Sequence, residues 1–374
     1  MNPIKLDRAC DNFEEFKTRL NPTRVIDQYE VLLDDLFTIR TPHTKFMVDY
    51  KEELDEFVSD YLAGKNIIDV GEWFFFPWNG LLVHYLPDQE HQEVRTARNR
   101  NIITEDEQKK FYNYRVAIAG LSVGSHPALT MGMMGGPKMM KLADPDVLGP
   151  SNLNRLRYDF TTIGDKKVDL VVNTLWQMNP YGDYHRYSVG VTTGNIDQFL
   201  EGVDLLVEEV DNLEMKIRLR LEARKRGIPV IMATDNGDNV IVDIERFDLE
   251  KNLELFNGIA GHIDLEEFQK IKPADLPKLA TKIAGKDMVM PRMLDSLLGV
   301  GKTLYSWPQL GDAATLAGVS LAYITKRLAL GESLRSGKLE VNLDKIFDPD
   351  YDLPENQGRR DANRSQFAKI IGLE

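Results

Sequence analysis

The chain has 374 residues and carries 46 Lys and Arg against 59 Asp and Glu, which gives a formal net charge of −13. This negative balance argues against nucleic acid or an anionic membrane surface as the main partner. No apolar run approaches the ~20 residues of a membrane span, and the N-terminus has no apolar signal-peptide core, so we expect a cytoplasmic protein. The single cysteine, Cys10, excludes an intramolecular disulfide and a zinc site built from CxxC pairs, so no zinc is expected.

Residues 1–92 have a mixed, acidic composition that predicts a small N-terminal α+β domain. Helices are expected over 27–37 and 50–62, and the segment GLLVHYL at 80–86 is typical of a strand. An aromatic run, WFFFPW at 73–78, precedes that strand. It has two interpretations: an aromatic core, which we favour, or an exposed aromatic face that grips a partner peptide.

From residue 114 onward, apolar runs alternate with helical stretches. Unbroken apolar strands that alternate with helices are typical of a parallel sheet covered on both faces. The sequence therefore predicts a doubly wound, Rossmann-like α/β domain over 93–335, whose ligand lies at the carboxyl ends of the strands. The expected strands are 116–120, 140–144, 205–211, 229–234 and 240–245, and the expected helices are 126–134, 166–179, 215–226 and 312–330.

Two segments fall outside this alternation. Residues 252–286 lack the strand–helix pattern, and we expect a long excursion or lid there. Residues 336–374 are expected to form a C-terminal extension with a pair of strands and a loose tail, because Asp, Asn, Arg and Gly are frequent after residue 348.

A turn of small residues joins the first strand of the 93–335 domain to its first helix. It reads Gly120-Leu121-Ser122-Val123-Gly124-Ser125, and it lets backbone N–H groups approach an anion at the helix N-terminus. Asp144 ends the second strand, where a carboxylate can bind a ribose hydroxyl. The motif is not a full GxGxxG. These residues therefore favour equally a nicotinamide- or flavin-dependent oxidoreductase and a nucleotide-binding transferase.

The segments after Asp144 separate the two interpretations. They read DPDVLGPSNLNR at 144–155, GDKK at 164–167 and VDN at 210–212. Arginine offers a planar fork for phosphate oxygens and lysine a point charge, and an acid such as Asp211 can hold Mg²⁺ together with phosphate oxygens and water. An ATP-cleaving enzyme needs such a cluster, whereas a hydride-transfer enzyme does not.

These segments resemble the ubiquitin-activating-enzyme-like superfamily, which includes ThiF, MoeB and HesA. The family pattern is a glycine turn, D-x-D-x-V, S-N-L-N-R, G-x-x-K and then D-N at a strand end, and the match covers about residues 95–245. The resemblance implies a ThiF-type fold and ATP-dependent adenylation. In that reaction a carboxylate attacks the α-phosphate of Mg·ATP, pyrophosphate leaves, and an acyl adenylate remains for further bond formation.

The resemblance assigns the nucleotide contacts residue by residue. It places Asp144 on the ATP ribose, with Asp146 beside it near the adenosine and the metal. Asp211 is expected to bind Mg²⁺, and Asn212 to support it. The residues expected around the phosphates are Gly120, Ser122, Gly124 and Ser125 of the turn, followed by Asn152, Arg155 and Lys167.

A basic segment precedes the first strand of the expected domain. Residues 98–103, RNRNII, are similar to the R-x-x-R-Q-I/L segment of the family. The resemblance implies that Arg100 is an arginine finger that reaches across a homodimer to the γ-phosphate. The alternative interpretation of these arginines is a solvated basic turn.

The chain departs from many relatives in ways that bear on its function. It lacks their zinc-binding CxxC pairs, and residues 236–286 hold no cysteine, so we expect no thioester transfer within the chain. Zinc-less, cysteine-less relatives with an extra N-terminal domain resemble the peptide-modifying branch, as in microcin and pantocin maturation. The resemblance thus implies a peptide or small protein as the carboxylate substrate, with residues 1–92 as its clamp. An NAD(P)- or FAD-dependent oxidoreductase and a non-catalytic nucleotide-binding protein remain the alternatives.

Overall fold

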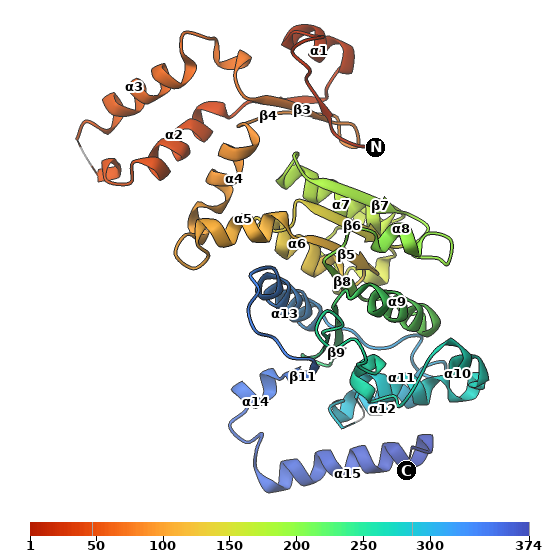
Figure 1. Cartoon of the computed structure of the whole chain (residues 1–374). Helices are drawn as coiled ribbons and strands as arrows, with labels where there is room; N and C mark the ends of the chain where they lie inside the picture. Colours follow the sequence, from red (N-terminus) through yellow and green to blue (C-terminus); the bar gives the residue numbers. More distant parts are fainter. Residues whose placement is uncertain (47, 286, 374) are drawn as a thin grey trace. The chain divides into compact units, whose positions relative to one another are not determined.

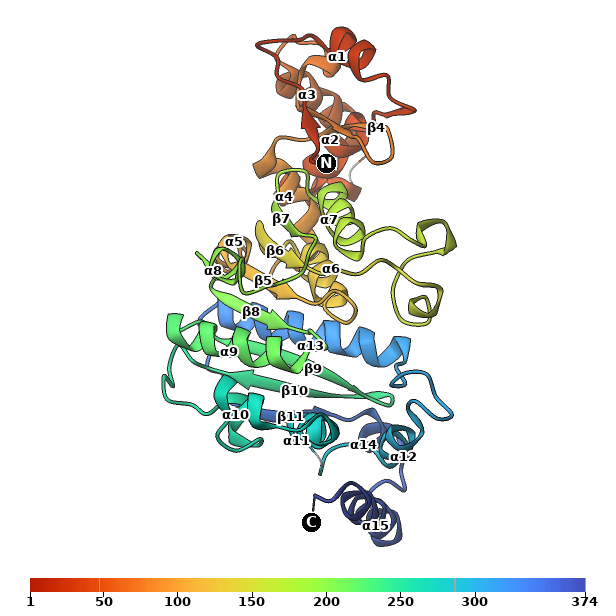
Figure 2. The ribbon, with the colours of Figure 1, turned by 90° about the vertical axis from the view of Figure 1, so that its right-hand side faces the viewer.

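The computed structural model describes residues 1–46, 48–285 and 287–373 (Figures 1 and 2). The chain divides into two compact units, Met1–Lys109 with Asn173–Gly182, and Lys110–Val172 with Asp183–Glu374. They are called unit 1 and unit 2 below. Among the described residues, no helix combines the length and apolarity that a membrane crossing requires.

Unit 1 contains a four-stranded sheet with the strand order β1-β3-β4-β2. Its strands are β1 (Ile4–Lys5), β2 (Arg24–Ile26), β3 (Glu72–Phe76) and β4 (Leu81–Tyr85). Its helices are α1 (Phe13–Leu20), α2 (Tyr29–Arg40), α3 (Tyr50–Leu62) and α4 (Asp88–Thr96), and α5 (Glu105–Asn113) follows at its boundary. The N-terminal domain is therefore α+β, as expected.

The aromatic run of unit 1 forms its core. Trp73, Phe74, Phe75 and Phe76 lie on β3, and all four side chains are buried. The interpretation of this run as an aromatic core is confirmed, and the exposed aromatic face is wrong. The physical reason is that β3 is a central strand with covered faces, so large rings there have more to gain from burial than from exposure.

Unit 2 is built on a seven-stranded sheet with the order β11-β10-β9-β8-β5-β6-β7. The five strands from β9 to β7 run parallel, while β10 and β11 are antiparallel to their neighbours at one edge. The strands are β5 (Arg115–Ala119), β6 (Met139–Ala143), β7 (Asp183–Tyr187), β8 (Leu205–Glu208), β9 (Val230–Asn236), β10 (Asn239–Glu245) and β11 (Gly337–Val341).

Helices cover both faces of this sheet, which makes the domain doubly wound. Figure 1 shows α13 (Gly311–Ala329) and α9 (Leu213–Arg226) on opposite sides of strands β8 and β9. With both faces covered, all four residues of β8 are buried, which explains why the strands read as unbroken apolar runs. Chain order reverses between β5 and β8, and the carboxyl ends of strands at such a reversal are where ligands bind in this architecture.

Unit 2 contains further α-helices, and short 3₁₀ helices occur along the chain. The α-helices are α6 (Ser125–Met133), α7 (Lys167–Met178, which ends in unit 1), α8 (Ile196–Leu200), α10 (Leu265–Lys270), α11 (Leu276–Ala284), α12 (Pro291–Gly299), α14 (Leu343–Phe347) and α15 (Pro354–Ile371). The short 3₁₀ helices of the chain are Thr44–Phe46, Ile67–Asp69, Ala97–Asn99, Pro150–Asn152, Phe160–Thr162, Leu255–Gly258 and Pro273–Asp275.

The structure corrects the expected sheet in two places. β10 runs antiparallel to β9, not parallel as expected: the two strands form a hairpin in which Asn236 pairs with Asn239. Gly237 makes this two-residue turn possible, because its φ of +70° suits a glycine. The sequence analysis also missed β7, whose polar residues at 183–187 alternate less clearly than the apolar strands.

The C-terminal part is more ordered than expected. A single strand, β11, joins the edge of the main sheet, so the expected separate strand pair is wrong. The expected loose tail is also wrong, because residues 354–371 form α15, which buries Phe367 in a cluster with Val289 and Met293. Residues 286 and 374, which end the expected excursion and tail, lie outside the described residues.

Candidate functional site

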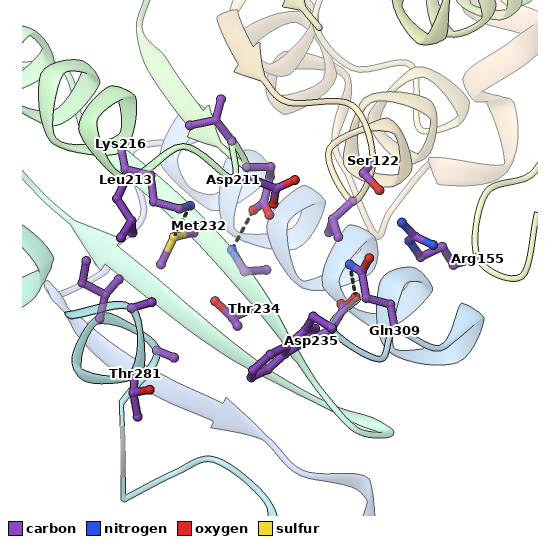
Figure 3. A pocket seen from close by; sticks show the side chains of 18 of the residues that line it. Ser122, Arg155, Asp211, Leu213, Lys216, Met232, Thr234, Asp235, Thr281 and Gln309 are labelled. Carbon is purple, nitrogen blue, oxygen red and sulfur yellow. Dashed lines mark hydrogen bonds between the residues drawn. The ribbon is translucent and has the colours of Figure 1, made fainter. Parts of the chain in front are cut away.

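A cavity of about 450 Å³ opens in unit 2 at the carboxyl ends of β5, β8 and β9 (Figure 3). This volume is within the range of small-molecule sites. Its location agrees with the expectation from the reversal of strand order. Its polar lining residues are Ser122, Asp146, Asn152, Arg155, Lys167, Glu209, Asp211, Lys216, Thr234, Asp235, Thr281 and Gln309.

The turn between β5 and α6 brings backbone to the edge of the cavity. Gly120 has φ +87°, and a Cβ built on it would lie 2.3 Å from the carbonyl oxygen of Glu209, so only glycine fits here. Ser122 lines the cavity, and its buried Oγ has no hydrogen-bond partner among the described residues. Ser125 points elsewhere, since its Oγ donates to the carbonyl oxygen of Ser122 at 2.9 Å. Gly120, Gly124 and Ser125 thus shape the turn, while Ser122 faces the ligand space.

Asp144 holds the turn in place from the end of β6. Its Oδ2 accepts from the backbone N–H of Leu121 at 2.6 Å, and its Oδ1 from that of Asp146 at 2.8 Å. Burial raises the pKa of this carboxyl, and the two N–H donors oppose the rise. Asp144 does not line the cavity, whereas Asp146 does.

Two further predicted residues, Asp146 and Lys167, lie at the cavity as a pair. Lys167 Nζ donates to Asp146 Oδ2 at 3.0 Å, and the lysine side chain is nearly buried while the aspartate is exposed. Asn152 also lines the cavity, and its Oδ1 accepts from the backbone N–H of Gly149. The ammonium of Lys167 supplies a charged donor at the cavity, which suits an anionic ligand.

Arg155 is fixed by the loop that carries it. Its Nη1 donates to the carbonyl oxygen of Ser151 at 3.2 Å and to Asn154 Oδ1 at 3.0 Å. His126 on α6 donates through Nε2 to the carbonyl oxygen of Arg155 at 2.7 Å. The buried Nε of Arg155 has no partner within the described part of the chain, and burial lowers the pKa of the guanidinium. The side chain therefore carries an unused donor at the cavity.

Asp211 and Asn212 take different positions after β8. Asp211 is exposed and lines the cavity, so it can offer a carboxylate to Mg²⁺. Asn212 is the N-cap of α9, where its Oδ1 accepts from the backbone N–H of Met215 at 2.9 Å. Within residues 1–46, 48–285 and 287–373, no group of three or more His, Cys, Asp and Glu side chains is gathered for a metal ion. A magnesium ion here would need oxygens from its ligand and from water.

Comparison with known families shows what this domain is. Residues 96–238 match the ThiF family. The chain carries a ThiF family domain. The parallel core of unit 2, with its cavity at the reversal of strand order, is the Rossmann-like ThiF-type fold.

Two curated relatives align with parts of the chain. The chain is 33% identical over 276 residues to the uncharacterized protein MT1398 of Mycobacterium tuberculosis (strain CDC 1551 / Oshkosh), a match that covers 74% of this chain and 38% of that protein. It is 30% identical over 138 residues to the tRNA threonylcarbamoyladenosine dehydratase of Bacillus subtilis (strain 168), covering 36% of this chain and 54% of that protein. The chain thus spans 38% and 54% of the length of these relatives.

A solved structure of E. coli MccB with ATP also aligns with the chain. The sequence identity is 14%, the TM-score is 0.49, and the alignment covers 70% of this chain and 78% of that chain.

The structure adds residues to the site of the ThiF domain that the sequence analysis did not single out. Asp235 is the second-last residue of β9, and its Oδ2 accepts from Gln309 Nε2 at 3.1 Å. Glu209 follows β8, and its Oε1 accepts from the backbone N–H of Ala233 at 2.7 Å, while burial raises the pKa of its carboxyl. Lys216 Nζ donates to both carboxylate oxygens of Glu208. The sequence could have indicated Glu209 and Asp235, because both are polar residues near the end of an apolar strand. Gln309 is distant in sequence and reaches Asp235 only in the folded chain.

Arg100 belongs to unit 1, and its Nη2 lies 3.4 Å from Glu93 Oε1. Half of its side chain is exposed to solvent. Its role as an arginine finger therefore stays a prediction.

The cavity fits a polyphosphate on chemical grounds. Arg155 and Lys167 supply cationic donors, and Ser122 Oγ and Arg155 Nε are buried atoms for which the described residues offer no partner. Buried polar groups are nearly always satisfied in folded proteins, so donors left open at a cavity are available to a ligand that brings acceptors. Phosphate oxygens are such acceptors, and they also carry the negative charge that these cations attract.

Proposed function

We propose that this protein is an adenylating enzyme, which uses ATP to activate the carboxyl group of a substrate. The observation that carries the proposal is the cavity of the ThiF domain, where the unpartnered Arg155 Nε and Ser122 Oγ lie with Lys167 and Asp211. In the proposed step, a carboxylate oxygen forms a bond to the α-phosphorus of ATP. The bond from that phosphorus to the bridging oxygen breaks, and pyrophosphate leaves with the electron pair.

The residues of the cavity contribute position and charge rather than a nucleophile. Arg155 and Lys167 would neutralise the phosphates, and the Ser122 hydroxyl would donate to a phosphate oxygen. Asp211 would hold Mg²⁺ together with phosphate oxygens and water. Asp144 would keep the turn in shape through its hydrogen bonds to the backbone N–H groups of Leu121 and Asp146. Its contact with the ribose stays a prediction, because Asp144 does not line the cavity.

The proposed chemistry uses no protein thiol. Cys10 is exposed in unit 1, and a hydrogen bond from its Sγ to Asp7 raises the pKa of the thiol. A raised pKa lowers the thiolate fraction, which is the reactive form. We propose that the acyl adenylate is used directly by an acceptor, without a thioester on this chain.

We further propose that the carboxylate belongs to a peptide and that unit 1 binds it. The support is that residues 1–109 fold mostly as a unit of their own, with the short edge strands β1 and β2. An extended peptide can pair with such an edge. The test is pyrophosphate exchange with a peptide and with its free C-terminal amino acid, and a peptide that is no better a substrate than the free amino acid would contradict this proposal.

The adenylation proposal is tested by calorimetric titration with Mg·ATP, with NADH run in parallel. We expect ATP to bind and NADH not to bind. Arg155→Ala should weaken ATP binding by roughly 10- to 100-fold, because a charged hydrogen bond to phosphate is lost. Arg157→Ala is the matched control, since Arg157 is exposed and does not line the cavity. Binding of NADH alone, or equal effects of the two variants, would overturn the proposal.

A further inference from the structure

Part of the cavity is apolar and is not explained by a polyphosphate. Ile283, Val289, Leu297 and Trp307 line it, and the first two are buried. Ile283 belongs to α11 and Leu297 to α12, and all four residues lie outside the motifs of the ThiF family that the sequence displays. Asn236 fixes this wall to the sheet, because it donates to the carbonyl oxygen of Met288 and accepts from the backbone N–H of Met290.

Asp235 presents an unused acceptor to the same cavity. Its side chain is 4% exposed, and its buried Oδ1 has no hydrogen-bond partner among the residues that the structure describes. The other oxygen, Oδ2, accepts from Gln309 Nε2 (Figure 3). A buried carboxylate with an empty oxygen is costly unless a ligand brings a donor to it.

Arg155 and Asp235 form a pair of opposite charges that leave each other unsatisfied. The charge of each side chain shifts the pKa of the other, yet neither Arg155 Nε nor Asp235 Oδ1 has a hydrogen-bond partner in the described part of the chain. Gln309 keeps the two near one another, since its side chain binds Asp235 and its carbonyl oxygen accepts from Asn154, the residue before Arg155. The site thus offers a cation for an anion and, beside it, an acceptor for an N–H donor.

We propose that Asp235 and the apolar wall select the carboxylate substrate: an amino-acid unit with an apolar side chain, whose α-nitrogen donates to Asp235 Oδ1. This inference rests on the proposed adenylation. The attacking carboxylate must lie against the phosphates at Arg155, and the α-nitrogen of an amino acid is only two bonds from its carboxyl carbon. The apolar side chain would then pack against Val289, Leu297 and Trp307.

Other substituents fit these contacts less well. A plain hydrocarbon acid fills the apolar wall but leaves Asp235 Oδ1 without a donor. An acidic side chain would lie near the buried carboxyls of Asp235 and Glu209, which is unfavourable. A site built around a hydrogen bond to a substrate N–H can reject the analogue that lacks it by about 10⁴-fold. Both a free amino acid and the C-terminal residue of a peptide carry the required chemistry.

The experiment measures ATP–pyrophosphate exchange with four carboxylates: leucine, a tripeptide that ends in leucine, 4-methylpentanoate, which lacks only the α-nitrogen of leucine, and aspartate. We expect leucine or the tripeptide to exceed 4-methylpentanoate by at least about 100-fold in kcat/KM. The acid that supports the faster pyrophosphate exchange shows which donor the site prefers: leucine offers an ammonium, and the tripeptide offers an amide N–H.

Variants separate recognition from folding and from nucleotide binding. Asp235→Ala should reduce the preference over 4-methylpentanoate to less than about 10-fold, because the acceptor is gone. Asp235→Asn keeps an acceptor oxygen but loses the negative charge. Pyrophosphate exchange with the tripeptide, whose amide N–H is neutral, should therefore be preserved better than exchange with leucine, whose ammonium is charged. Asp312→Asn is the matched control, because Asp312 acts electrostatically on Asp235 but does not line the cavity. The affinity for ATP, measured by calorimetry, should stay unchanged in Asp312→Asn, and the same titration of the two Asp235 variants shows that their nucleotide site still forms.

The failures of the two proposals can be told apart. If the protein does not bind ATP, the proposed adenylation fails. The inference about the substrate is overturned if the protein binds ATP but leucine, the tripeptide and 4-methylpentanoate support pyrophosphate exchange equally well. It is also overturned if none of the three supports exchange. Equal loss of exchange with all acids in Asp235→Ala, with ATP affinity intact, would also overturn it.

Discussion

At the scale of single residues, the cavity separates side chains that shape the site from those that face its ligand. Asp144 uses both carboxylate oxygens on backbone N–H groups, while Ser122 and Arg155 direct unused donors into the cavity. The chain order of the motifs predicted that these residues meet. It could not show which of these side chains would be bound by backbone N–H groups rather than left open to a ligand, because those hydrogen bonds form only in the folded turn.

The role of Asp144 as a structural acceptor leads to a stability prediction. Asp144→Ala leaves the buried N–H groups of Leu121 and Asp146 without their acceptor, so the free energy of unfolding should fall by about 3 kcal/mol. Asp159→Ala is the control, since Asp159 accepts from the backbone N–H of Thr161 at an exposed helix start. That change should cost only about 1 kcal/mol. Urea unfolding of the two variants checks this, and equal losses would contradict a special role of Asp144.

Asp235 gives the protein a distinct pH dependence. Burial raises the pKa of its carboxyl to about 6, opposed by Gln309 and Arg155 and assisted by Asp312. The folded state then binds more protons than the unfolded state between about pH 4 and 6, so the contribution of Asp235 to stability falls as the pH rises through that window. The fall should be on the order of 2 kcal/mol.

Asp235→Asn should remove this dependence. The free energy of unfolding of the wild type minus that of the variant should become more negative from pH 4 to pH 7. Denaturant unfolding at several pH values measures the difference, and a difference that is constant across the range would show that the pKa of Asp235 is not raised.

At the scale of secondary structure elements, the turn between β5 and α6 depends on glycine for two separate reasons. Gly120 has a positive φ and also lies against the backbone of Glu209, whereas Gly331 at the end of α13 has φ +71° with open space around it. Gly331→Ala should therefore cost only the conformational strain, about 1–2 kcal/mol. Gly120→Ala should cost at least about 3 kcal/mol, because a Cβ cannot fit there. Thermal and urea unfolding compare the two, and similar losses would contradict the close approach at Gly120.

The start of α9 provides a test of Asn212. Asn212→Ala removes the N-cap acceptor of Met215 and should lower the free energy of unfolding by about 1 kcal/mol. Asn342→Ala removes the side-chain cap of α14 and also the hydrogen bond from Asn342 Nδ2 to Tyr351, so it should cost somewhat more. If Asn212 acts only as a cap, both variants should bind ATP like the wild type. Weaker ATP binding in Asn212→Ala alone would favour the predicted support of the metal site.

The elements themselves were predictable where burial alone decides them. Apolar runs such as 116–119 gave the parallel core, because a strand covered on both faces needs no polar side. The two strands that flank 236–239 were expected, but their antiparallel pairing was missed, since its signal is the glycine of the turn, Gly237, rather than a pattern of hydrophobicity. The order of 354–371 was missed as well, because that polar helix becomes stable by burying Phe367 against residues distant in sequence.

At the scale of the whole molecule, the chain consists of a ThiF domain with its cavity in unit 2 and an N-terminal unit with a separate aromatic core. The cavity residues that we propose for ATP all belong to unit 2. Arg100, the predicted arginine finger, belongs to unit 1. In a homodimer, Arg100 of one subunit would complete the cavity of the other subunit.

Mixing two inactive variants tests that arrangement. Arg100→Ala lacks the finger but keeps Lys167, and Lys167→Ala lacks the phosphate contact but keeps the finger. In a hybrid dimer, one site then has both residues intact and the other has neither. Random mixing should restore about a quarter of the wild-type activity, since half the dimers are hybrids and each has one working site of two.

Subunit exchange must be shown in the same samples, for example by native mass spectrometry of differently tagged subunits. Pyrophosphate exchange is then measured before and after mixing. If Arg100 acted within its own subunit, every site in a hybrid would lack one of the two residues, and no activity would return. Subunit exchange without recovery would therefore place Arg100 in the site of its own subunit. An Arg100→Ala variant that is active before mixing would instead place Arg100 among the solvated basic residues of its segment. Recovery would establish both the dimer and the finger, because no monomer in the mixture holds a complete site.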